Sequence, residues 1–402
     1  MSITLNKKQE LAVKEAKKWW NDPSRRNNEV FSIMGYAGCG KSTAVKSIIE
    51  ALDIDEGNIG YIAFTGMAAS VLTKKGNTAS TIHKLIYNPW QDDKGKIHFN
   101  LKEVEELEDL DLLVLDEISQ VSQNLLDDLY SFKKPMISLG DPQQFPPVSG
   151  KPNDLVTKKP NIFLDEVMRQ ALDNPIVWAA TQWREGIQVP YGTHGDNLII
   201  IPKDQVSNEM MTEVDQIITF KNSSVDYINN YVRKEIYNLD SPLPYLGEKL
   251  LCIKNDWTKT ISENGIEQDL VNGLMGYVTK IGNYNKTYDF FDISLQPTYF
   301  KDKEYKKLKA DGRYFLDGLK SDDVFYNDPK YKKLLTLRNS LYNSTKTNIN
   351  KFAYGYGLTT YKSQGTEYPS VLYIDEPLRK DMYWKSAYVG ATRAQETLIF
   401  AR

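Results

Sequence analysis

The sequence predicts an α/β fold with two parallel-sheet cores, a small β-hairpin insertion and a β-rich accessory domain. Short apolar runs alternate with helix-like stretches in the first half of the chain, at residues 30–34, 59–64, 110–115 and 136–139. Buried parallel strands have this continuously apolar pattern, and ligands gather at their carboxyl ends. The length of 402 residues exceeds one ordinary hydrophobic core, which favours at least two packed domains.

Two interruptions of this alternation divide the chain. Residues 84–107 carry DDKG between two short strand-like runs, which predicts a hairpin. Residues 247–350 begin β-rich and aromatic and continue rich in lysine, tyrosine and asparagine, which predicts an inserted accessory domain. The first core then comprises residues 1–83 and 108–170. The second core comprises residues 171–246 and 351–402, with strands expected at 217–220, 371–374 and 398–401.

The composition, with 41% hydrophobic and 26% charged residues, is typical of a globular protein. No apolar stretch approaches the roughly 20 residues that cross a bilayer, and MSITLNKKQE lacks an apolar signal core, so we expect a cytoplasmic protein without a membrane partner. Cys39 and Cys252 are expected to be reduced. The net charge of -3 argues against a surface coated in positive charge, although backbone amides, hydroxyls and a few lysines can still hold phosphates.

GYAGCGKS is the first motif that carries chemistry, and it lies between the strand-like VFSIM and the helix-like TAVKSIIEAL. This context is the one a phosphate-binding loop requires, and a chance glycine-rich turn does not need it. Glycines let backbone N–H groups turn toward phosphate oxygens, the lysine reaches the outer phosphates, and the serine hydroxyl binds magnesium. The expected nucleotide-binding residues are Gly35, Gly38, Gly40, Lys41, Ser42 and Thr43.

Two further strand ends carry polar groups suited to nucleotide hydrolysis. LLVLDEIS places Asp116 to hold Mg²⁺ and Glu117 to orient and deprotonate a water molecule, against the alternative of a solvated acidic turn. SLGDPQQFPPV places Gln144 where its amide can sense the terminal phosphate, against the alternative of an ordinary polar loop residue.

Gln9 has two interpretations. NKKQELAV offers Asn6 as a helix cap with Gln9 three positions later, which is a capping box that needs no ligand. The paired donor and acceptor of the same amide could instead read the edge of adenine. The position of Gln9 in the motif series described next favours adenine.

The ordered motifs GYAGCGKS, AFTGMAASVL, TASTIHKLIY, LDEIS, GDPQQFPPV, FLDEVMRQ, YGLTTYKSQGTEY and YVGATRAQ resemble those of superfamily 1 helicases. The resemblance spans nearly the whole chain. It is closest to the RecD-like branch, superfamily 1B, and within it to the small phage-encoded Dda-type helicases, whose setting would be the host cytoplasm. It implies two RecA-like cores, an SH3-like accessory domain, and ATP with Mg²⁺ as cofactors.

The resemblance also assigns the second face of the nucleotide site. Arg169 and Arg393 would be arginine fingers that neutralise charge on the transferred phosphoryl group, and Gly365 and Glu367 would line the cleft. The alternatives are a surface ion pair for Arg169 and a solvated C-terminal arginine for Arg393.

Single-stranded DNA would be held along the motifs at the other strand ends, and the hairpin would act as a pin that opens the duplex. The chain departs from the family at Tyr361, where many relatives carry histidine; the ring can still stack on a base. Helix capping for Thr81, a satisfied histidine for His83, and packing of hairpin aromatics on their own domain are the alternatives. The expected DNA-binding residues are Thr65, Thr81, His83, Trp90, Phe99, Thr360 and Tyr361.

The resemblance implies a motor that hydrolyses ATP, moves 5′ to 3′ on single-stranded DNA as a monomer, and unwinds duplexes at single-strand/double-strand junctions. Single-strand-binding and replication proteins are the partners such a motor would meet. Two rival hypotheses remain open: a P-loop phosphotransferase acting on a small molecule, and an ATP-gated nucleic-acid clamp that never unwinds. Glu117, Arg169 and Arg393 together argue against the clamp, which gains little from a complete hydrolytic set.

Overall fold

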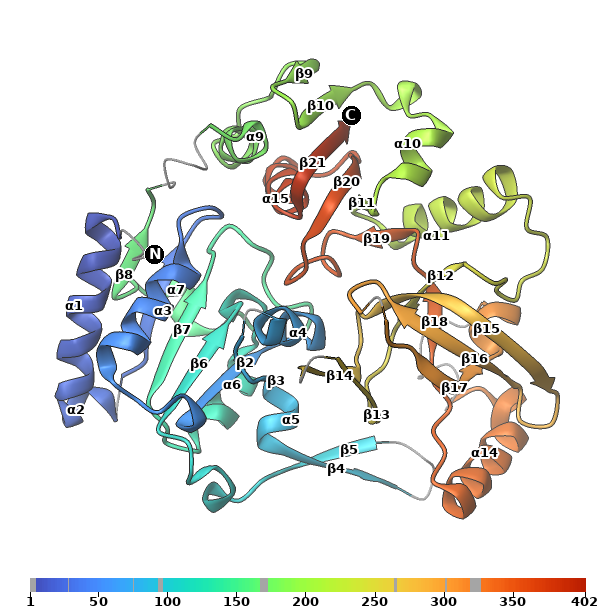
Figure 1. Ribbon diagram of the computed structural model, residues 1–402, viewed down its shortest axis with the longest axis horizontal. Coiled ribbons are helices and arrows are strands. Elements are labelled where there is room, and N and C mark those ends of the chain that lie inside the picture. The colour runs from blue at the N-terminus through green and yellow to red at the C-terminus, as the bar shows by residue number, and fades with distance from the viewer. Residues whose placement is uncertain are drawn as a thin grey trace. The chain divides into compact units, whose positions relative to one another are not determined.

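The computed structural model describes residues 5–27, 29–74, 76–92, 97–166, 173–263, 266–300, 302–318 and 327–402 (Figure 1). The chain forms two compact units. The first unit comprises Met1–Tyr87, Leu101–Lys221 and Thr359–Arg402, and the second comprises Asn88–Asn100 and Asn222–Leu358. Each unit is described by itself below.

The first sheet of the first unit has six strands in the order β3-β2-β6-β7-β1-β8. Every neighbouring pair is parallel. The strands are β1 (Phe31–Gly35), β2 (Ile59–Ala63), β3 (Ala79–Thr81), β6 (Leu112–Asp116), β7 (Met136–Gly140) and β8 (Ile162–Leu164). Four of them match the apolar runs that the sequence predicts as strands, and the carboxyl ends of all six share one edge of the sheet.

The strands are apolar on both faces because helices cover both. Leu112 and Val114 of β6 pack in one core cluster with residues of α1 and α3. Leu113 and Leu115 of the same strand pack in another cluster with residues of α5 and α6. The period of two along a strand therefore divides one continuous apolar run between two hydrophobic cores. The helices of this part of the chain are α1 (Lys7–Asn21) and α2 (Pro23–Arg26), which precede β1, and α3 (Lys41–Leu52), α4 (Gly66–Lys74), α5 (Ile82–Ile86), α6 (Gln123–Tyr130) and α7 (Asp154–Thr157).

The second sheet of the first unit has the order β19-β11-β20-β21-β10-β9. The pairs β11/β20, β20/β21 and β10/β21 are parallel, and β9 joins β10 antiparallel. The strands are β9 (Gly192–His194), β10 (Leu198–Ile201), β11 (Gln216–Thr219), β19 (Gly357–Thr359), β20 (Tyr368–Ile374) and β21 (Ala394–Ala401), and the helices are α9 (Pro175–Arg184), α10 (Asn208–Glu213) and α15 (Lys380–Ala391). The strands expected near residues 217, 371 and 398 are β11, β20 and β21, so the prediction of a second parallel sheet is confirmed.

Helix α9 shows why these helices pack against the second sheet. Its buried residues Ile176, Ala179, Ala180 and Trp183 follow the spacing of one helical face. Trp183 stacks on Phe400 of β21 with a ring separation of 4.3 Å, and Tyr373 of β20 stacks on the same Phe400 at 4.7 Å. Helices α9 and α15 also contact one another. Both helices are thereby fixed to the sheet.

The second unit is mainly antiparallel. It contains the two-stranded sheet β4-β5, the two-stranded sheet β13-β14 and a five-stranded sheet in the order β17-β16-β15-β12-β18. Its strands are β4 (Tyr87–Gln91), β5 (Ile97–Leu101), β12 (Lys249–Cys252), β13 (Asp256–Glu263), β14 (Ile266–Leu270), β15 (Met275–Asn285), β16 (Phe290–Pro297), β17 (Tyr305–Asp311) and β18 (Phe352–Tyr354), and its helices are α11 (Asn222–Tyr231), the π-helical turn Val232–Ile236, α12 (Arg313–Leu316) and α14 (Lys332–Thr345). The hairpin is therefore present, and its tip at residues 93–96 lies outside the described residues.

Both cysteines are free and buried, as expected for reduced thiols. Among the described residues, the structure contains no helix that combines the length and the apolar character needed to cross a membrane.

Candidate nucleotide and nucleic-acid site

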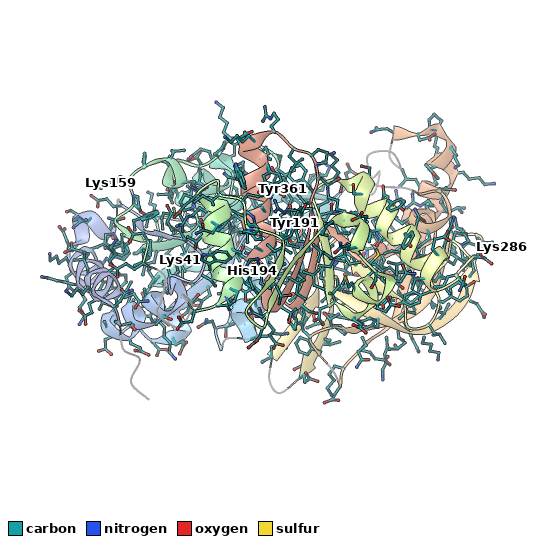
Figure 2. All side chains as sticks on the ribbon, turned by 90° about the horizontal axis from the view of Figure 1, so that it is seen from above. Lys41, Lys159, Tyr191, His194, Lys286 and Tyr361 are labelled. Atoms are coloured by element: carbon teal, nitrogen blue, oxygen red, sulfur yellow. The ribbon has the colours of Figure 1, made fainter. Side chains whose placement is uncertain are left out.

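The glycine-rich loop follows β1 directly and leads into α3. Gly38 and Gly40 have φ values of +76° and +73°, a region that glycine enters without steric cost. Lys41 donates hydrogen bonds through Nζ to the carbonyls of Gly35 at 2.8 Å and Tyr36 at 3.0 Å, so its ammonium lies across the mouth of the loop (Figure 2 labels Lys41). Ser42 is exposed in the first turn of α3. This geometry suits a phosphate-binding loop.

Gln9 joins the start of α1 to the end of this loop. Its Oε1 accepts from the Asn6 backbone N–H at 2.9 Å, and the Asn6 side chain accepts from the Gln9 N–H, which completes the capping box. Its Nε2 donates to the Gly40 carbonyl at 3.1 Å, and the side chain is fully buried. The capping interpretation is therefore present in the structure, and the reading of adenine stays a prediction.

The two acidic residues lie at the carboxyl end of β6. Asp116 is the last residue of the strand, and its Oδ1 accepts from the Glu117 backbone N–H at 2.8 Å. Glu117 adopts a left-handed backbone with a φ of +56°, an uncommon conformation for a non-glycine residue that the surrounding structure must hold in place. Burial first, and the charge of Asp116 second, raise the pKa of Glu117 to about 7. The charges of Arg393 and Lys41 act in the opposite direction.

Gln144 follows β7 in a turn that Asp141 organises. The Asp141 carboxylate accepts from the Gln143 N–H at 2.9 Å, and its backbone carbonyl accepts from the Gln144 N–H at 3.1 Å. The buried Gln144 side chain accepts through Oε1 from Gln364 Nε2 at 3.3 Å. Gln364 follows β19, so a residue of the second sheet contacts the expected phosphate sensor of the first.

Arg393, just after α15, is buried and held by three hydrogen bonds. Its guanidinium donates to the carbonyls of Val389 at 3.2 Å and Thr366 at 3.1 Å, and to the Thr392 hydroxyl at 3.1 Å. This arginine is therefore not the solvated C-terminal residue of the alternative interpretation. Because its charge acts on Glu117, it lies within electrostatic reach of the acidic pair. Arg169 lies outside the described residues.

Gly365 and Glu367 follow β19 as well. Gly365 has a φ of +74°, and a Cβ added there would lie 2.9 Å from the Ala68 Cβ and 3.5 Å from the Thr65 hydroxyl. The glycine thus allows the second sheet's loop to approach α4 closely. Glu367 is exposed and accepts from Gln395 Nε2 at 2.9 Å.

Thr65, Thr81 and His83 lie where the carboxyl ends of β2 and β3 lead into helices. The Thr65 hydroxyl accepts from the Ala68 N–H at 3.1 Å, and the Thr81 hydroxyl caps α5 by accepting from the Lys84 N–H at 3.1 Å. His83 is half-buried, and burial lowers its pKa, so the ring is neutral at neutral pH. Thr81 therefore has the capping role of the alternative interpretation, and contact of these residues with DNA stays a prediction.

The expectation that Thr360 points toward a bound strand is wrong for this structure. Thr360 is fully buried, and its hydroxyl lies within hydrogen-bond distance of the Thr219 carbonyl at 3.0 Å and the Ser386 hydroxyl at 3.2 Å. It therefore ties the turn after β19 to the second sheet. The neighbouring Tyr361 stacks on the buried Phe145 with a ring separation of 4.2 Å, which leaves base stacking by its other face as a prediction (Figure 2 labels Tyr361).

Trp90 and Phe99 lie on opposite strands of the hairpin in the second unit. Their exposed fractions are 47% and 45%. Trp90 stacks on His98 at 4.7 Å and donates through Nε1 to Asn100 at 3.1 Å. Both aromatics thus lie on the flanks of the hairpin, where the wedge role stays a prediction.

Sequence reasoning missed two contacts between the helices of the second sheet and the phosphate-binding loop. The guanidinium of Arg184, at the end of α9, lies 3.8 Å from the centre of the Tyr36 ring. The Tyr388 hydroxyl, on α15, accepts from the Ala37 N–H at 2.9 Å and donates to the Asp141 carboxylate. Tyr388 lies inside the motif YVGATRAQ, which could have marked it, whereas Arg184 belongs to no motif.

Comparison with known proteins places these motifs in a family. A family model described as "AAA domain" matches residues 4–193, which contain the glycine-rich loop, the acidic pair and Gln144. The chain is 28% identical to an uncharacterised protein of Acanthamoeba polyphaga mimivirus, over 98% of this chain and 99% of that protein. It is 26% identical to the ATP-dependent DNA helicase dda of Enterobacteria phage T4, over 92% and 93% of the two chains.

The ATP-dependent RecD2 DNA helicase of Deinococcus radiodurans is 29% identical over 64% of this chain, which spans 37% of RecD2. Among solved structures, a Pif1 helicase studied at forked double-stranded DNA superposes with a TM-score of 0.58 at 17% identity, over 100% of this chain and 92% of that one. A Bacteroides Pif1 in complex with ADP-AlF3 and single-stranded DNA superposes at 0.52 and 16% identity, over 100% and 93%. The structures establish a common fold, and the sequence relatives and the ordered motifs agree with it. The chain is thus similar to ATP-dependent DNA helicases, over nearly its whole length in the case of dda and over 64% of its length in the case of RecD2.

Proposed function

We propose that the protein is an ATP-dependent DNA helicase that translocates on single-stranded DNA and unwinds duplexes. The observation that carries the proposal is the meeting of both sheets of the first unit at one loop. Tyr388 contacts the loop at Ala37, and Gln364 contacts Gln144 beside it. A nucleotide in this loop would therefore touch groups from both sheets, and its hydrolysis could change how they are held together. The relatives dda and RecD2 are named as ATP-dependent DNA helicases.

The described residues fit Mg²⁺ bound together with ATP. Mg²⁺ prefers oxygen ligands and retains several waters, so one or two protein oxygens suffice. Ser42 presents a hydroxyl in the first turn of α3, and Asp116 presents a carboxylate at the end of β6. Burial first, and the charge of the neighbouring Asp116 second, raise the pKa of Glu117, and a cation beside these two half-buried carboxylates would stabilise them. Bound there, Mg²⁺ would neutralise charge on the phosphates.

In this proposal the remaining residues divide the work of hydrolysis. The loop amides and Lys41 hold the phosphates, Thr43 supports them from α3, and Glu117 takes the proton of the attacking water. Gln144 senses the terminal phosphate. Arg169 and Arg393 stabilise the charge of the transition state, while Gly365 and Glu367 line the far side of the nucleotide. Gln9 either reads adenine or only anchors the loop through Gly40.

The nucleic-acid side of the proposal follows the family. Thr65, Thr81, His83 and Tyr361 would contact single-stranded DNA, and Trp90 and Phe99 on the hairpin would meet the junction. The inserted domain would be SH3-like, which its five-stranded antiparallel sheet supports. Travel would run 5′ to 3′ by one protein molecule, with single-strand-binding and replication proteins as partners.

ATP turnover with and without single-stranded DNA tests the proposal first. A helicase is stimulated by the oligonucleotide, and Lys41→Ala abolishes turnover. A phosphotransferase would turn over ATP at the same rate with and without the oligonucleotide. Duplexes with a tail at either the 5′ or the 3′ end then report strand separation and its polarity. A protein that is stimulated by DNA but separates neither duplex is a clamp, and that result would overturn the helicase proposal.

A further inference from the structure

Tyr388 is buried at 2% exposure, and its hydroxyl uses both of its hydrogen-bonding capacities on the first sheet's motifs. It accepts from the Ala37 N–H at 2.9 Å, inside the phosphate-binding loop, and donates to the Asp141 carboxylate. Asp141 is also buried, at 1% exposure. A hydrogen bond to a buried carboxylate is among the stronger ones in proteins, and removing the donor leaves the carboxylate incompletely satisfied.

The hydroxyl keeps its proton under all physiological conditions. Burial first, and the charge of Asp141 second, hold the pKa of Tyr388 well above its usual range. Lys385, one turn earlier on α15, is half-buried and within electrostatic reach of the same carboxylate. The phenol therefore keeps the proton that it donates to Asp141.

The two partners of the hydroxyl belong to different parts of the nucleotide site. Ala37 is the third residue of GYAGCGKS, and Asp141 holds the turn that presents Gln144. One phenol thus fixes the phosphate-binding loop and the sensor turn relative to each other. Because Tyr388 lies on α15, it fixes both relative to the second sheet.

The same helix leads to Arg393. The Thr392 N–H donates to the Tyr388 carbonyl at 3.1 Å, and Arg393 Nε donates to the Val389 carbonyl, so the arginine is bonded to the turn of helix that carries the tyrosine. The guanidinium cannot move far relative to the phenol without breaking these bonds. The hydrogen bonds of the Tyr388 hydroxyl to Ala37 and Asp141 therefore influence where the Arg393 guanidinium lies relative to Glu117.

We propose that Tyr388 is a positioning residue for ATP hydrolysis. Its hydrogen bonds to Ala37 and Asp141 fix the position of α15, and with it the position of Arg393. The inference rests on the proposed function, because it concerns the same nucleotide site. It adds a group whose two hydrogen-bonding partners are protein atoms and which acts through Arg393. Transition-state stabilisation by an arginine depends on its placement, so a small loss of register lowers the rate of hydrolysis without weakening nucleotide binding.

Tyr388→Phe tests the inference because it keeps the ring and removes only the hydroxyl. We expect kcat for DNA-stimulated ATP hydrolysis to fall about tenfold or more, the loss expected for one hydrogen bond to a charged group. The affinity for a fluorescent ADP analogue should stay within about twofold of wild type, because the loop amides and Lys41 are unchanged. Tyr383→Phe is the matched control. Tyr383 is on the same helix, but its hydroxyl contacts Gln188, which lies between α9 and β9 and not in the first sheet's motifs. Its kcat should equal that of wild type.

An Arg393→Ala background separates positioning from general damage. If Tyr388 acts through Arg393, adding Tyr388→Phe to Arg393→Ala lowers kcat by less than about twofold further, since coupled residues are non-additive. Independent, multiplicative losses would overturn the inference. So would a Tyr388→Phe variant with wild-type kcat, or one whose melting temperature and ADP affinity fall together with kcat. A wild-type protein without DNA-stimulated turnover would instead count against the proposed function.

Discussion

At the scale of one residue, the function of Arg393 depends on the fixed orientation of its guanidinium as well as on its charge. Three hydrogen bonds, to Val389, Thr366 and Thr392, fix its plane. Lysine keeps the charge but cannot reproduce this planar fork. We therefore expect Arg393→Lys to lower the rate of ATP hydrolysis by roughly 10²-fold or more, which approaches the loss expected when an arginine finger is missing. Steady-state turnover at saturating DNA measures it, and a lysine variant with more than about a third of wild-type turnover would contradict the assigned role.

Gly365 shows the same dependence on a single backbone position. Alanine there meets both a left-handed φ of +74° and the Ala68 Cβ at 2.9 Å. Gly76, in the same unit, has a φ of +99° with nothing within 4 Å of an added Cβ, so Gly76→Ala measures the backbone cost by itself. That cost is about 1–2 kcal/mol.

Gly365→Ala should therefore destabilise the first unit by more than Gly76→Ala does, because α4 must shift to admit the methyl group. Denaturant unfolding of both variants measures the difference, and equal losses would show that the contact with Ala68 is easily relieved. Since α4 begins beside Thr65, the shifted helix should also weaken binding of single-stranded DNA. Gly76→Ala should leave DNA binding unchanged.

At the scale of elements, helix α14 is held to the five-stranded sheet by buried charge. Arg338 donates to both oxygens of the fully buried Asp311, at 2.7 and 3.0 Å, and also to the carbonyls of Tyr288 at 2.8 Å and Asp289 at 2.6 Å. Burial acts to raise the pKa of Asp311, but hydrogen bonds and charges from Arg313 and Arg338 outweigh it, so the pKa is lowered. The stabilisation is thus present at neutral pH and is lost as the pH falls through the lowered pKa.

Arg338→Met should destabilise the second unit by about 3–5 kcal/mol, because it leaves a buried carboxylate with an incomplete set of partners. Hydrogen exchange of the α14 amides should rise most, since the helix loses its principal attachment. Lys333→Met changes an exposed lysine on the same helix and should leave exchange unaltered. Unchanged protection of α14 in the Arg338 variant would show that apolar packing alone holds the helix.

The same scale shows what could be foreseen from sequence. Continuous apolar runs identify the strands, and the motifs at their ends are brought together because parallel strands share one carboxyl edge. The burial of Thr360 could not be foreseen, because spacing does not say which side of the turn after β19 packs on β11. The stacking of Arg184 on Tyr36 joins residues 148 positions apart in the chain with no motif to connect them. Contacts of this kind depend on how helices pack, which a local pattern does not encode.

At the scale of the whole molecule, the net charge of -3 means that phosphate binding depends on where individual cations lie and not on an overall excess of them. The expected strand contacts are hydroxyls, one neutral histidine and an aromatic ring, which release few counterions. We expect about three or four neutralised phosphates, which corresponds to a slope of about -2 to -3 in a plot of log K against log salt concentration for single strands. Fluorescence anisotropy of a labelled oligonucleotide measures this slope in a series of salt concentrations.

A shallow slope would fit a motor, since a strand held mainly by stacking and hydroxyl contacts can be released and regripped at each step. A slope near -7 would require about ten neutralised phosphates, and so a strongly basic channel in place of the hydroxyl and stacking contacts expected here. Tyr361→Ala should reduce affinity at every salt concentration while leaving the slope unchanged, because stacking involves no counterion release. A variant that changed the slope but not the affinity extrapolated to high salt would contradict base stacking. It would show that Tyr361 affects contacts with the phosphates of the DNA backbone and not with the bases.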